Sequence, residues 1–466
     1  MGLRVLARAL LAGSALLGAP ALSQVPVDRA AEIAALRAQL RAMEARLADL
    51  EAPAPIAQPA SPPVSTSTPA PAPAPRAAAA NTEIRFSGAP RFSQGEWSFK
   101  PRGRIQLDAG YVSAPDGVPE AGLGFATRLR RGRLGVEGTV PGGFGYRAEV
   151  DVAGGDVTFT DLYLSYEPSD ALTFTLGQHD NFQGLERQTS SNFTSFMERA
   201  GFTNAFNFER RLGLSAAWAK GPVLVQAGLF ADDLDALNAA PRGSGLGTEN
   251  GSWSVDGRAV YAPEIGEAQL HLGASLHRRQ QNGLADASVA TRYRHRPALR
   301  TTDIRFVDTG NLLVSAETHW GVEAALVRGP FHAAAEGHWL RASLLGAAEP
   351  TFFGGYAELG WFLTGESRGY RDGSFNRTRV ARPLGQGGMG AVQLNLRYDR
   401  LDLTDRPVIG GTQDALLASA IWIPQDHVRF LLNGGWLWYD DAALPAAGGD
   451  RSYGSFVLGA RAQIDF

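Results

Sequence analysis

The sequence predicts an all-β fold: a closed, antiparallel transmembrane β-barrel of about 16 strands, preceded by a short coiled-coil helix. Two observations lead to this prediction. Apolar and polar residues alternate at period two from about residue 100 to the end of the chain, as in strands whose two faces meet different surroundings. After residue 23, no run of about 18 apolar residues is present that would make a transmembrane helix.

Residues 1–23 have the composition of a signal peptide. Arg4 and Arg8 precede an apolar stretch, and the small residues at 21–23 suit a signal peptidase. We therefore expect export, with cleavage after this segment; an N-terminal membrane anchor is the alternative. The chain has no cysteine, which fits an oxidising compartment where a stray thiol is a liability.

Residues 24–51 change the period from two to that of a helix. Their apolar residues are spaced alternately three and four apart, which is the seam of a coiled coil. The seam consists of Ile33, Leu36, Leu40, Met43, Leu47 and Leu50. An amphipathic helix lying on the barrel or on the membrane surface is the alternative. Residues 52–95 are rich in proline and alanine and predict an extended linker, so the barrel domain is expected at 96–466.

The last stretch of the chain, SFVLGARAQIDF at 455–466, illustrates the barrel alternation. One face carries Phe456, Leu458, Ala460, Ala462, Ile464 and Phe466, and the other carries Arg461, Gln463 and Asp465. A soluble β-sandwich also alternates, but its strands are nearer five or six residues, whereas ETHWGVEAALV runs for 11. Aromatic residues gather near strand ends, as in the girdles of membrane barrels. The apolar face is therefore expected to meet lipid and the polar face a wet lumen; a soluble sandwich or β-solenoid is the alternative.

Residues 181–209, NFQGLERQTSSNFTSFMERAGFTNAFNFE, interrupt the alternation. A loop this long and this apolar is expected to pack against another part of the chain, and the nearest surface is the barrel wall that faces the lumen. We therefore expect it to fold inward and narrow the lumen, with Glu186, Arg187, Glu198 and Arg199 as its charged residues. A lid over the mouth or a mobile loop is the alternative.

Several motifs resemble the phosphate-selective porin O and P family. They are WSFKPRGRIQLDAGY, LGQHDNFQGLERQTSSNFTSFMERA and FLTGESRGY followed by LNLRYDRLDL, in this order, and the resemblance spans roughly residues 96–466. It implies a 16-stranded barrel in the bacterial outer membrane, in contact with lipid and lipopolysaccharide, commonly trimeric, with an inward constriction loop. It also implies that Phe466 serves as the signal read by the outer-membrane assembly machinery, and that the coiled coil lies in the periplasm.

The candidate pore-lining and anion-binding residues are Arg104, Arg131, Arg133 and Arg147, with Arg130 adjacent. The planar guanidinium group of arginine can donate two parallel hydrogen bonds to the oxygen atoms of one anion. Phosphate-specific members of the family have lysines near the constriction, but no lysine lies between Lys100 and Lys220 here. Acidic residues share the inward face, so the alternative is that the arginines form ion pairs with acidic residues of the barrel wall. We expect passive diffusion of small polar solutes, chiefly anions; a phosphate- or pyrophosphate-selective channel and a structural envelope tether are the alternatives.

No catalytic residue, cofactor or metal site is expected. His332, Glu336 and His338 share a strand face, but the two histidines stand about 20 Å apart along a strand, too far to share a metal. Glycine-rich stretches lack the Lys and Ser/Thr of a phosphate-binding loop, and no GxSxG motif is present. A hydrolase with scattered residues is the remaining enzymatic alternative. Without residues 1–23 the chain has 42 basic and 47 acidic residues, which gives no indication of nucleic-acid binding.

Overall fold

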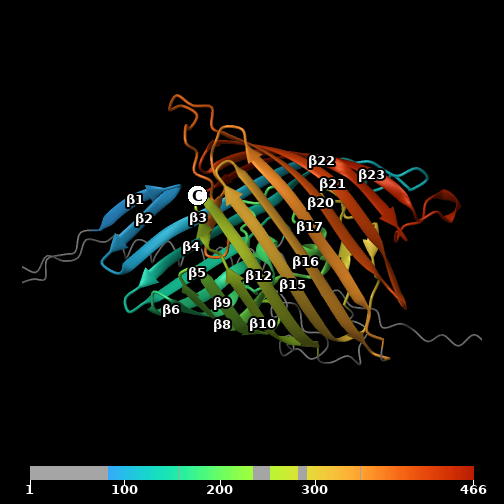
Figure 1. The fold of residues 1–466 in the computed structure, drawn as a ribbon, viewed down its shortest axis with the longest axis horizontal. Helices are drawn as coiled ribbons and strands as arrows, with labels where there is room; N and C mark the ends of the chain where they lie inside the picture. Colours follow the sequence, from blue (N-terminus) through green and yellow to red (C-terminus); the bar gives the residue numbers. More distant parts are fainter. Residues whose placement is uncertain (1–81, 156, 235–251, 282–290, 347) are drawn as a thin grey trace, which may run out of the picture. The chain divides into compact units, whose positions relative to one another are not determined.

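The structure is a computed structural model that describes residues 82–466 except 156, 235–251, 282–290 and 347 (Figure 1). Contacts divide the chain at residues 77 and 78, and the unit described below is the second one. The predicted signal peptide and coiled coil, together with most of the predicted linker, lie outside the described residues.

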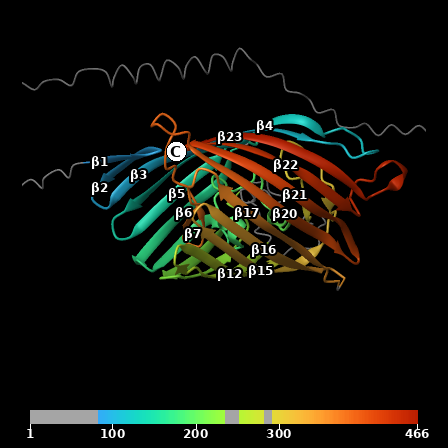
Figure 2. The ribbon, with the colours of Figure 1, turned by 45° about the horizontal axis from the view of Figure 1, so that its top comes forward.

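Sixteen long strands of the described unit form one closed barrel (Figures 1 and 2). Each strand pairs antiparallel with the next, and the last, β23, pairs with the first, β3, so that no edge is left open. This confirms the prediction of a closed barrel of about 16 strands. The strands are β3 (Trp97–Val112), β4 (Gly124–Val140), β5 (Phe144–Asp151), β6 (Thr158–Ser169), β7 (Leu172–Asp180), β8 (Arg210–Lys220), β9 (Val223–Phe230), β10 (Ser252–Tyr261), β12 (Ala268–Gln281), β15 (Val314–Arg328), β16 (Phe331–Leu344), β17 (Thr351–Phe362), β20 (Ala391–Asp405), β21 (Val408–Gln425), β22 (Val428–Asp440) and β23 (Tyr453–Asp465).

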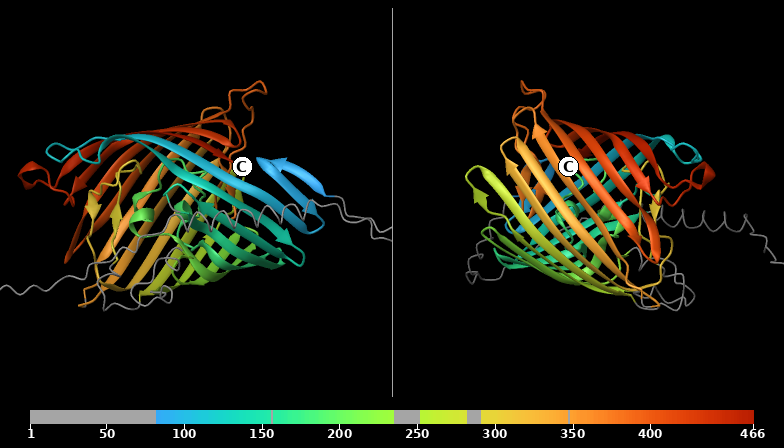
Figure 3. Two further views of the ribbon diagram at one scale, coloured as in Figure 1. Left: turned by 180° about the vertical axis from the view of Figure 1, so that it is seen from behind. Right: turned by 45° about the vertical axis from the view of Figure 1, so that its right-hand side comes forward.

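The barrel is apolar outside and polar inside. In β23, Leu458 and Ile464 are 44% and 45% exposed, whereas Arg461 is 3% exposed. This order is the reverse of a water-soluble sheet, and it is stable where the outer face meets hydrocarbon and every backbone group is paired within a closed sheet. The strands run obliquely around the barrel, as Figure 3 shows from two further sides.

Short connections at one end of the barrel use glycine where the backbone reverses. Gly329 adopts φ +52° between β15 and β16, and Gly221 adopts φ +56° between β8 and β9. A positive φ is accessible to glycine without a steric penalty. A proline follows each of these glycines and cannot continue the strand hydrogen bonding. The pair therefore fixes a tight turn and the register of both hairpins.

Strand structure begins before the predicted barrel domain. β1 (Glu83–Ser87) and β2 (Ala89–Gln94) form a hairpin within residues 52–95, the range predicted as linker. The proline- and alanine-rich composition ends near residue 80, and charged and apolar residues alternate from Glu83 onward. β2 pairs with the start of β3 only over Phe92–Gln94. The hairpin therefore continues from this end of β3 and is not one of the strands of the barrel wall.

The remaining described elements are short. They are α2 (Leu185–Gln188), α3 (Gly201–Ala205), β11 (Glu264–Ile265), β13 (Arg294–His295), β14 (Val307–Asp308), β18 (Gly369–Arg371), β19 (Ser374–Asn376) and the 3-10 turn η2 (Ala447–Gly449). No helix among the described residues is long and apolar enough to cross a bilayer.

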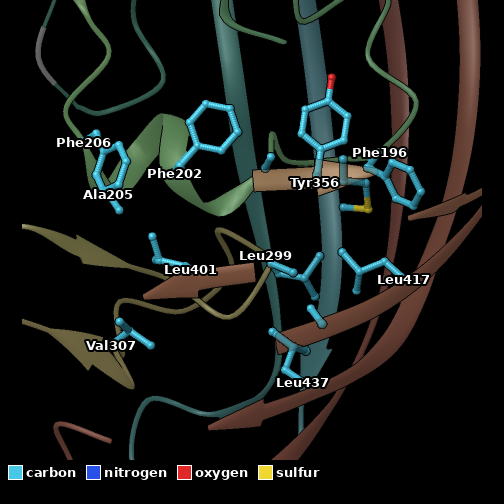
Figure 4. Packing of buried hydrophobic residues seen from close by; sticks show 14 of the residues in the cluster. Phe196, Phe202, Ala205, Phe206, Leu299, Val307, Tyr356, Leu401, Leu417 and Leu437 are labelled. Atoms are coloured by element: carbon cyan, nitrogen blue, oxygen red, sulfur yellow. The ribbon is translucent and has the colours of Figure 1, made fainter. Parts of the chain in front are cut away.

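The hydrophobic core is formed by loop side chains packing against the barrel strands. Figure 4 shows Phe196, Phe202 and Phe206 from residues 181–209 beside Tyr356 of β17 and Leu401 of β20. Phe196 and Phe202 are at most 1% exposed. The apolar residues that interrupt the strand alternation therefore supply part of this core.

Candidate functional site

Residues 181–209 connect β7 to β8 and are held by carboxylates of the barrel strands. Glu336 accepts hydrogen bonds from the backbone N–H groups of Leu185, at 2.9 Å, and Glu186, at 2.6 Å, in the first turn of α2. Asp399 accepts one from the N–H of Gly201, the first residue of α3, at 2.9 Å. The first N–H groups of a helix have no partner within it, so a buried carboxylate satisfies them and fixes the segment.

Arginines of the strands hold the same segment from other sides. Arg397 of β20 bonds the carboxylate of Glu186 at 3.0 Å, and Arg461 of β23 bonds that of Glu198 at 3.1 Å. Arg429 of β22 donates to the carbonyl oxygen of Thr194 at 3.1 Å. Because these are charge-assisted bonds between buried groups, they are stronger than surface ion pairs and hold the segment in one position.

A first cavity of about 370 Å³ lies between residues 187–199 and the strands β3–β8. Ten basic side chains and five acidic ones line it, so its lining carries an excess of positive charge. The basic ones are Lys100, Arg102, Arg104, Arg131, Arg133, Arg147, Arg187, Arg199, Arg210 and Arg377, and the acidic ones are Glu137, Glu149, Asp161, Asp180 and Asp465.

Two further cavities continue this lining. The second, of about 360 Å³, shares five arginines with the first, and these five are called the arginine group: Arg131, Arg133, Arg187, Arg199 and Arg210. The third, of about 220 Å³, is lined by four arginines and two acids, and one of these arginines, Arg300, also lines the second. Positively charged side chains thus follow one another through all three cavities.

Three of the arginines predicted to bind anions are engaged in ion pairs. Arg130 makes two hydrogen bonds to Glu198, at 2.6 and 2.9 Å. Arg133 bonds Asp151 at 2.8 Å. Arg147 bonds Glu137 at 2.8 Å. The geometry of these three arginines is that of ion pairs within the barrel wall, which is the alternative that the sequence left open.

Arg104 and Arg131 differ from the other three. Arg104 donates to the hydroxyl of Ser191 at 2.6 Å, and Arg131 donates to the amide oxygen of Gln106 at 2.6 Å. Within the described ranges neither forms an ion pair, and the Nε of each is buried without a hydrogen-bond partner. Both line the first cavity, so each brings to it a guanidinium group that is not held in an ion pair.

A β-bulge explains how two consecutive arginines both reach the interior. Gln106 of β3 pairs with Arg131, whereas the next residue, Leu107, pairs with Leu129, so Arg130 is an extra residue in β4. A bulge of this kind redirects the neighbouring side chains. Strict alternation places only one of Arg130 and Arg131 inside, and no residue pattern indicates the bulge.

The charged residues predicted for the loop have different partners. Glu186 pairs with Arg397, and Arg187 pairs with Asp180 at the end of β7. Burial opposes the charge of Glu198, but Arg130 outweighs it and holds the pKa of that carboxyl well below its usual range. Glu186 and Glu198 therefore serve as attachment points of the loop.

Arg199 forms no ion pair among the residues that the structure describes. Its Nε donates to the carbonyl oxygen of Glu186 at 2.9 Å, and its Nη2 donates to that of Thr189. Burial and the neighbouring Arg187 lower the pKa of Arg199 to about 10, so its guanidinium stays charged at neutral pH. Its charge is solvated by carbonyl dipoles and remains available to an anion in the adjoining cavities.

Sequence reasoning missed several residues of the lining. Arg102 has the same parity as Arg104, so alternation would have found it. Arg210 is the first residue of β8 and pairs with Asp161 at 2.6 Å. Arg300 and Arg377 lie between strands, where no periodicity indicates a direction. The sequence carries no signal that would place these two beside the arginines of β4.

Comparisons with known proteins give one family and several relatives. The family model described as phosphate-selective porin O and P matches residues 99–466. An uncharacterised protein of Caulobacter vibrioides is 50% identical over 443 residues, which cover 93% of this chain and 89% of that protein. Porin O of Pseudomonas aeruginosa is 26% identical over 349 residues, which cover 68% of this chain and 75% of that protein.

Among solved structures, the anion-selective porin of Comamonas acidovorans has a TM-score of 0.48 at 14% identity, covering 80% of this chain and 100% of that one. The outer-membrane protein OmpT of Vibrio cholerae has a TM-score of 0.49 at 10% identity, covering 80% of this chain and 98% of that one. The outer-membrane channel DcaP of Acinetobacter baumannii has a TM-score of 0.47 at 12% identity, covering 80% and 99%.

Proposed function

The chain belongs to the phosphate-selective porin O and P family and is an outer-membrane porin. From this premise we propose that it conducts small anions by passive diffusion along its three arginine-lined cavities. Residues 181–209 form the constriction. The observation that carries the proposal is the pair of buried arginines, Arg104 and Arg131, that line the first cavity without an ion-pair partner among the described residues.

The charge of the lining favours anions over cations. A narrow passage with low-dielectric walls and a surplus of one sign of charge concentrates ions of the opposite sign. The first cavity has twice as many basic as acidic side chains, and five of the basic ones continue into the second cavity. An anion that leaves one arginine therefore meets another, which lowers the barrier to its passage.

A phosphate- or pyrophosphate-selective channel is the second candidate. The arginine group favours it, because planar guanidinium forks bind phosphate oxygens bidentately. Arg131 and Arg199 are free of ion pairs in the described structure, so their forks are available to such an oxyanion. Against it stands the number of wall acids that already occupy Arg133 and Arg210.

Ion selectivity in a planar bilayer tests the proposal. The reversal potential of the wild-type porin under a potassium chloride gradient is expected to indicate anion preference, and Arg131→Ala is expected to reduce it. Arg341→Ala is the matched control, because the Arg341 side chain is 55% exposed and lines none of the three cavities. A cation-preferring wild type, or equal reversal potentials for wild type and Arg131→Ala, would contradict the proposal. Added phosphate that blocks chloride current would favour the second candidate.

The proposal also covers the association of the chains, the insertion of the barrel into the outer membrane and the position of the N-terminal segment. The family resemblance favours a homotrimer, insertion through the outer-membrane assembly machinery by way of Phe466, and a periplasmic position for residues 24–51. The backbone of Phe466 exchanges two hydrogen bonds of 3.0 Å with Gly103 of β3. Recognition of Phe466 is thus supported by its place at the seam that closes the barrel. A structural tether through residues 24–95 remains the alternative role of the N-terminal part.

A further inference from the structure

We propose that the barrel wall contains a binding site for one divalent transition-metal ion, formed by His277 of β12 with Glu317 and His319 of β15. The site goes beyond anion conduction and does not depend on it. None of its three residues lines the arginine cavities.

Strand register brings the three side chains together. β12 and β15 are paired antiparallel, and His277 lies directly opposite His319. Glu317 is two residues before His319 and therefore points to the same face of the sheet. One ligand atom from each residue lies within 4.8 Å of the others. Donors that surround a tetrahedral ion at about 2 Å stand about 3.3 Å apart, so small side-chain rotations complete the shell.

His319 lacks the hydrogen bonds that a buried imidazole requires. It is 2% exposed, and within the described chain neither of its ring nitrogens has a hydrogen-bond partner. Its Nε2 stands 3.7 Å from a carboxylate oxygen of Glu317, which is too long for a hydrogen bond. Buried polar groups are nearly always satisfied, so an imidazole without a hydrogen-bond partner that faces another imidazole and a carboxylate is suited to serve as a metal ligand.

Neighbouring residues orient the other two ligands. Asp256 of β10 accepts a hydrogen bond from Nδ1 of His277 at 2.5 Å, which leaves Nε2 as the donor to a metal. The hydroxyl of Tyr293 donates to one oxygen of Glu317 at 2.5 Å, which leaves the other oxygen available. Carboxylates behind metal-binding histidines and hydrogen bonds to ligating carboxylates are regular features of metal sites.

Charge and donor type define the class of ion. Two imidazoles and one carboxylate suit Zn²⁺, Ni²⁺, Cu²⁺ or Fe²⁺ rather than Mg²⁺ or Ca²⁺, which prefer oxygen alone. Asp256 and Glu317 supply negative charge. Arg279 and Arg211 supply opposing charge; the guanidinium of Arg279 stands 3.8 Å from Glu317 and closer, at 3.2 Å, to Asp232.

Residues 206–208 cover the site. The rings of Phe206 and Phe208 lie 6.1 and 5.8 Å from that of His319. The three ligands are at most 3% exposed, so an ion enters only when this cover shifts. Loading is therefore expected to be slow, and a bound ion is expected to tie the end of residues 181–209 to the wall.

This proposal departs from the sequence analysis, which expected no metal. That expectation concerned ligands along a single strand, His332, Glu336 and His338, and in the structure His332 does not join the other two. His338 bonds Glu336 at 3.0 Å, and His332 lies against Phe362 and Phe375 instead. The proposed site arises from pairing between two strands, which a single sequence does not reveal.

Metal binding to the purified, tag-free porin tests the proposal. The protein in detergent is treated with a chelator, incubated for a long period with Zn²⁺, dialysed, and analysed for bound metal per chain. One Zn²⁺ per chain is expected for the wild type, with affinity reduced at least about tenfold in His319→Ala and in Glu317→Gln. His332→Ala, which removes a buried wall histidine outside the site, is expected to bind like the wild type. The mobility of the folded barrel in gels without heating verifies that each variant is folded, and Glu317→Gln preserves side-chain shape if His319→Ala fails to fold.

Two results would overturn the proposal: a folded wild type that binds no stoichiometric Zn²⁺, and variants that bind it as tightly as the wild type. Mg²⁺ at the same concentration is expected to leave no bound metal after dialysis. Equal retention of Mg²⁺ would also count against it, since imidazole ligands do not favour that ion. Heat stability offers an independent readout, because Zn²⁺ is expected to raise the unfolding temperature of the wild type and not that of His319→Ala.

Discussion

At the scale of single residues, the partner of a buried arginine decides its role. Arg130 and Arg133 neutralise carboxylates, and their removal would leave those carboxylates buried and unpaired. Arg104 and Arg131 form no ion pair within the described structure, and their side-chain hydrogen bonds go to neutral oxygen atoms. The first pair is therefore expected to stabilise the wall, and the second to supply charge to the pore.

Stability measurements are expected to separate these two roles. Arg130→Ala leaves Glu198 with one bidentate partner fewer and is expected to cost about 3 kcal/mol of unfolding free energy. Arg131→Ala removes one hydrogen bond from a guanidinium to a neutral amide oxygen and is expected to cost less, about 1.5 kcal/mol. Unfolding in urea, followed by tryptophan fluorescence in detergent, measures both. Equal losses in the two variants would contradict the division.

Gly184 provides a second prediction at this scale. It adopts φ +76° before α2, and a Cβ there would stand 2.3 Å from Oε2 of Glu336, the oxygen that accepts from the N–H of Leu185. Gly184→Ala is thus expected to displace that carboxylate and loosen residues 181–209, giving larger and noisier single-channel currents. Gly329→Ala is the control, because Gly329 has φ +52° and no atom within 4 Å of a built Cβ. Unchanged currents in Gly184→Ala would show that Glu336 does not hold the loop.

At the scale of elements, residues 181–209 depend on charged attachments for their position. Glu198 is bonded by Arg130 and Arg461, and these bonds hold the pKa of its carboxyl below 4.5, its ordinary value, against the opposing effect of burial. A carboxyl with a lowered folded pKa stabilises the folded state above its ordinary pKa. That stabilisation is lost as the pH falls toward the folded pKa.

Glu198→Gln therefore has a defined pH signature. At neutral pH the wild type is expected to be more heat-stable than Glu198→Gln, and the difference is expected to shrink as the pH falls below 4.5. Unfolding temperatures of both proteins between pH 3 and pH 8, in steps of about one unit, measure it. A difference that grows toward low pH would contradict the assignment of Glu198 as a charged attachment point.

The predictability of each element follows from its local pattern. The long strands were foreseen because lipid outside and water inside impose alternation on every one of them. The hairpin β1–β2 and the bulge at Arg130 were not, because one follows a linker-like composition and the other breaks the alternation. Only some of the arginines that line the cavities can be predicted from the sequence. Those on strands follow parity, whereas Arg300 and Arg377 depend on the paths of long connections, which no sequence period describes.

At the scale of the whole molecule, closure of the barrel and association of chains are expected to be separate. The described barrel closes through β3 and β23 without using residues 24–51. Deleting residues 24–51 is therefore expected to weaken association while the barrel still folds. Light scattering coupled to size-exclusion chromatography measures the assembly, and gel mobility without heating measures the fold. A deletion variant that fails to insert would refute this separation.

Anion conduction past Arg104 and Arg131 is tested by the reversal potential of the wild-type porin under a salt gradient, with and without added phosphate. We expect a potential on the anion-selective side that moves toward zero in Arg131→Ala and in Arg104→Ala, while Arg341→Ala keeps the wild-type value. A cation-selective or unselective wild type would contradict it.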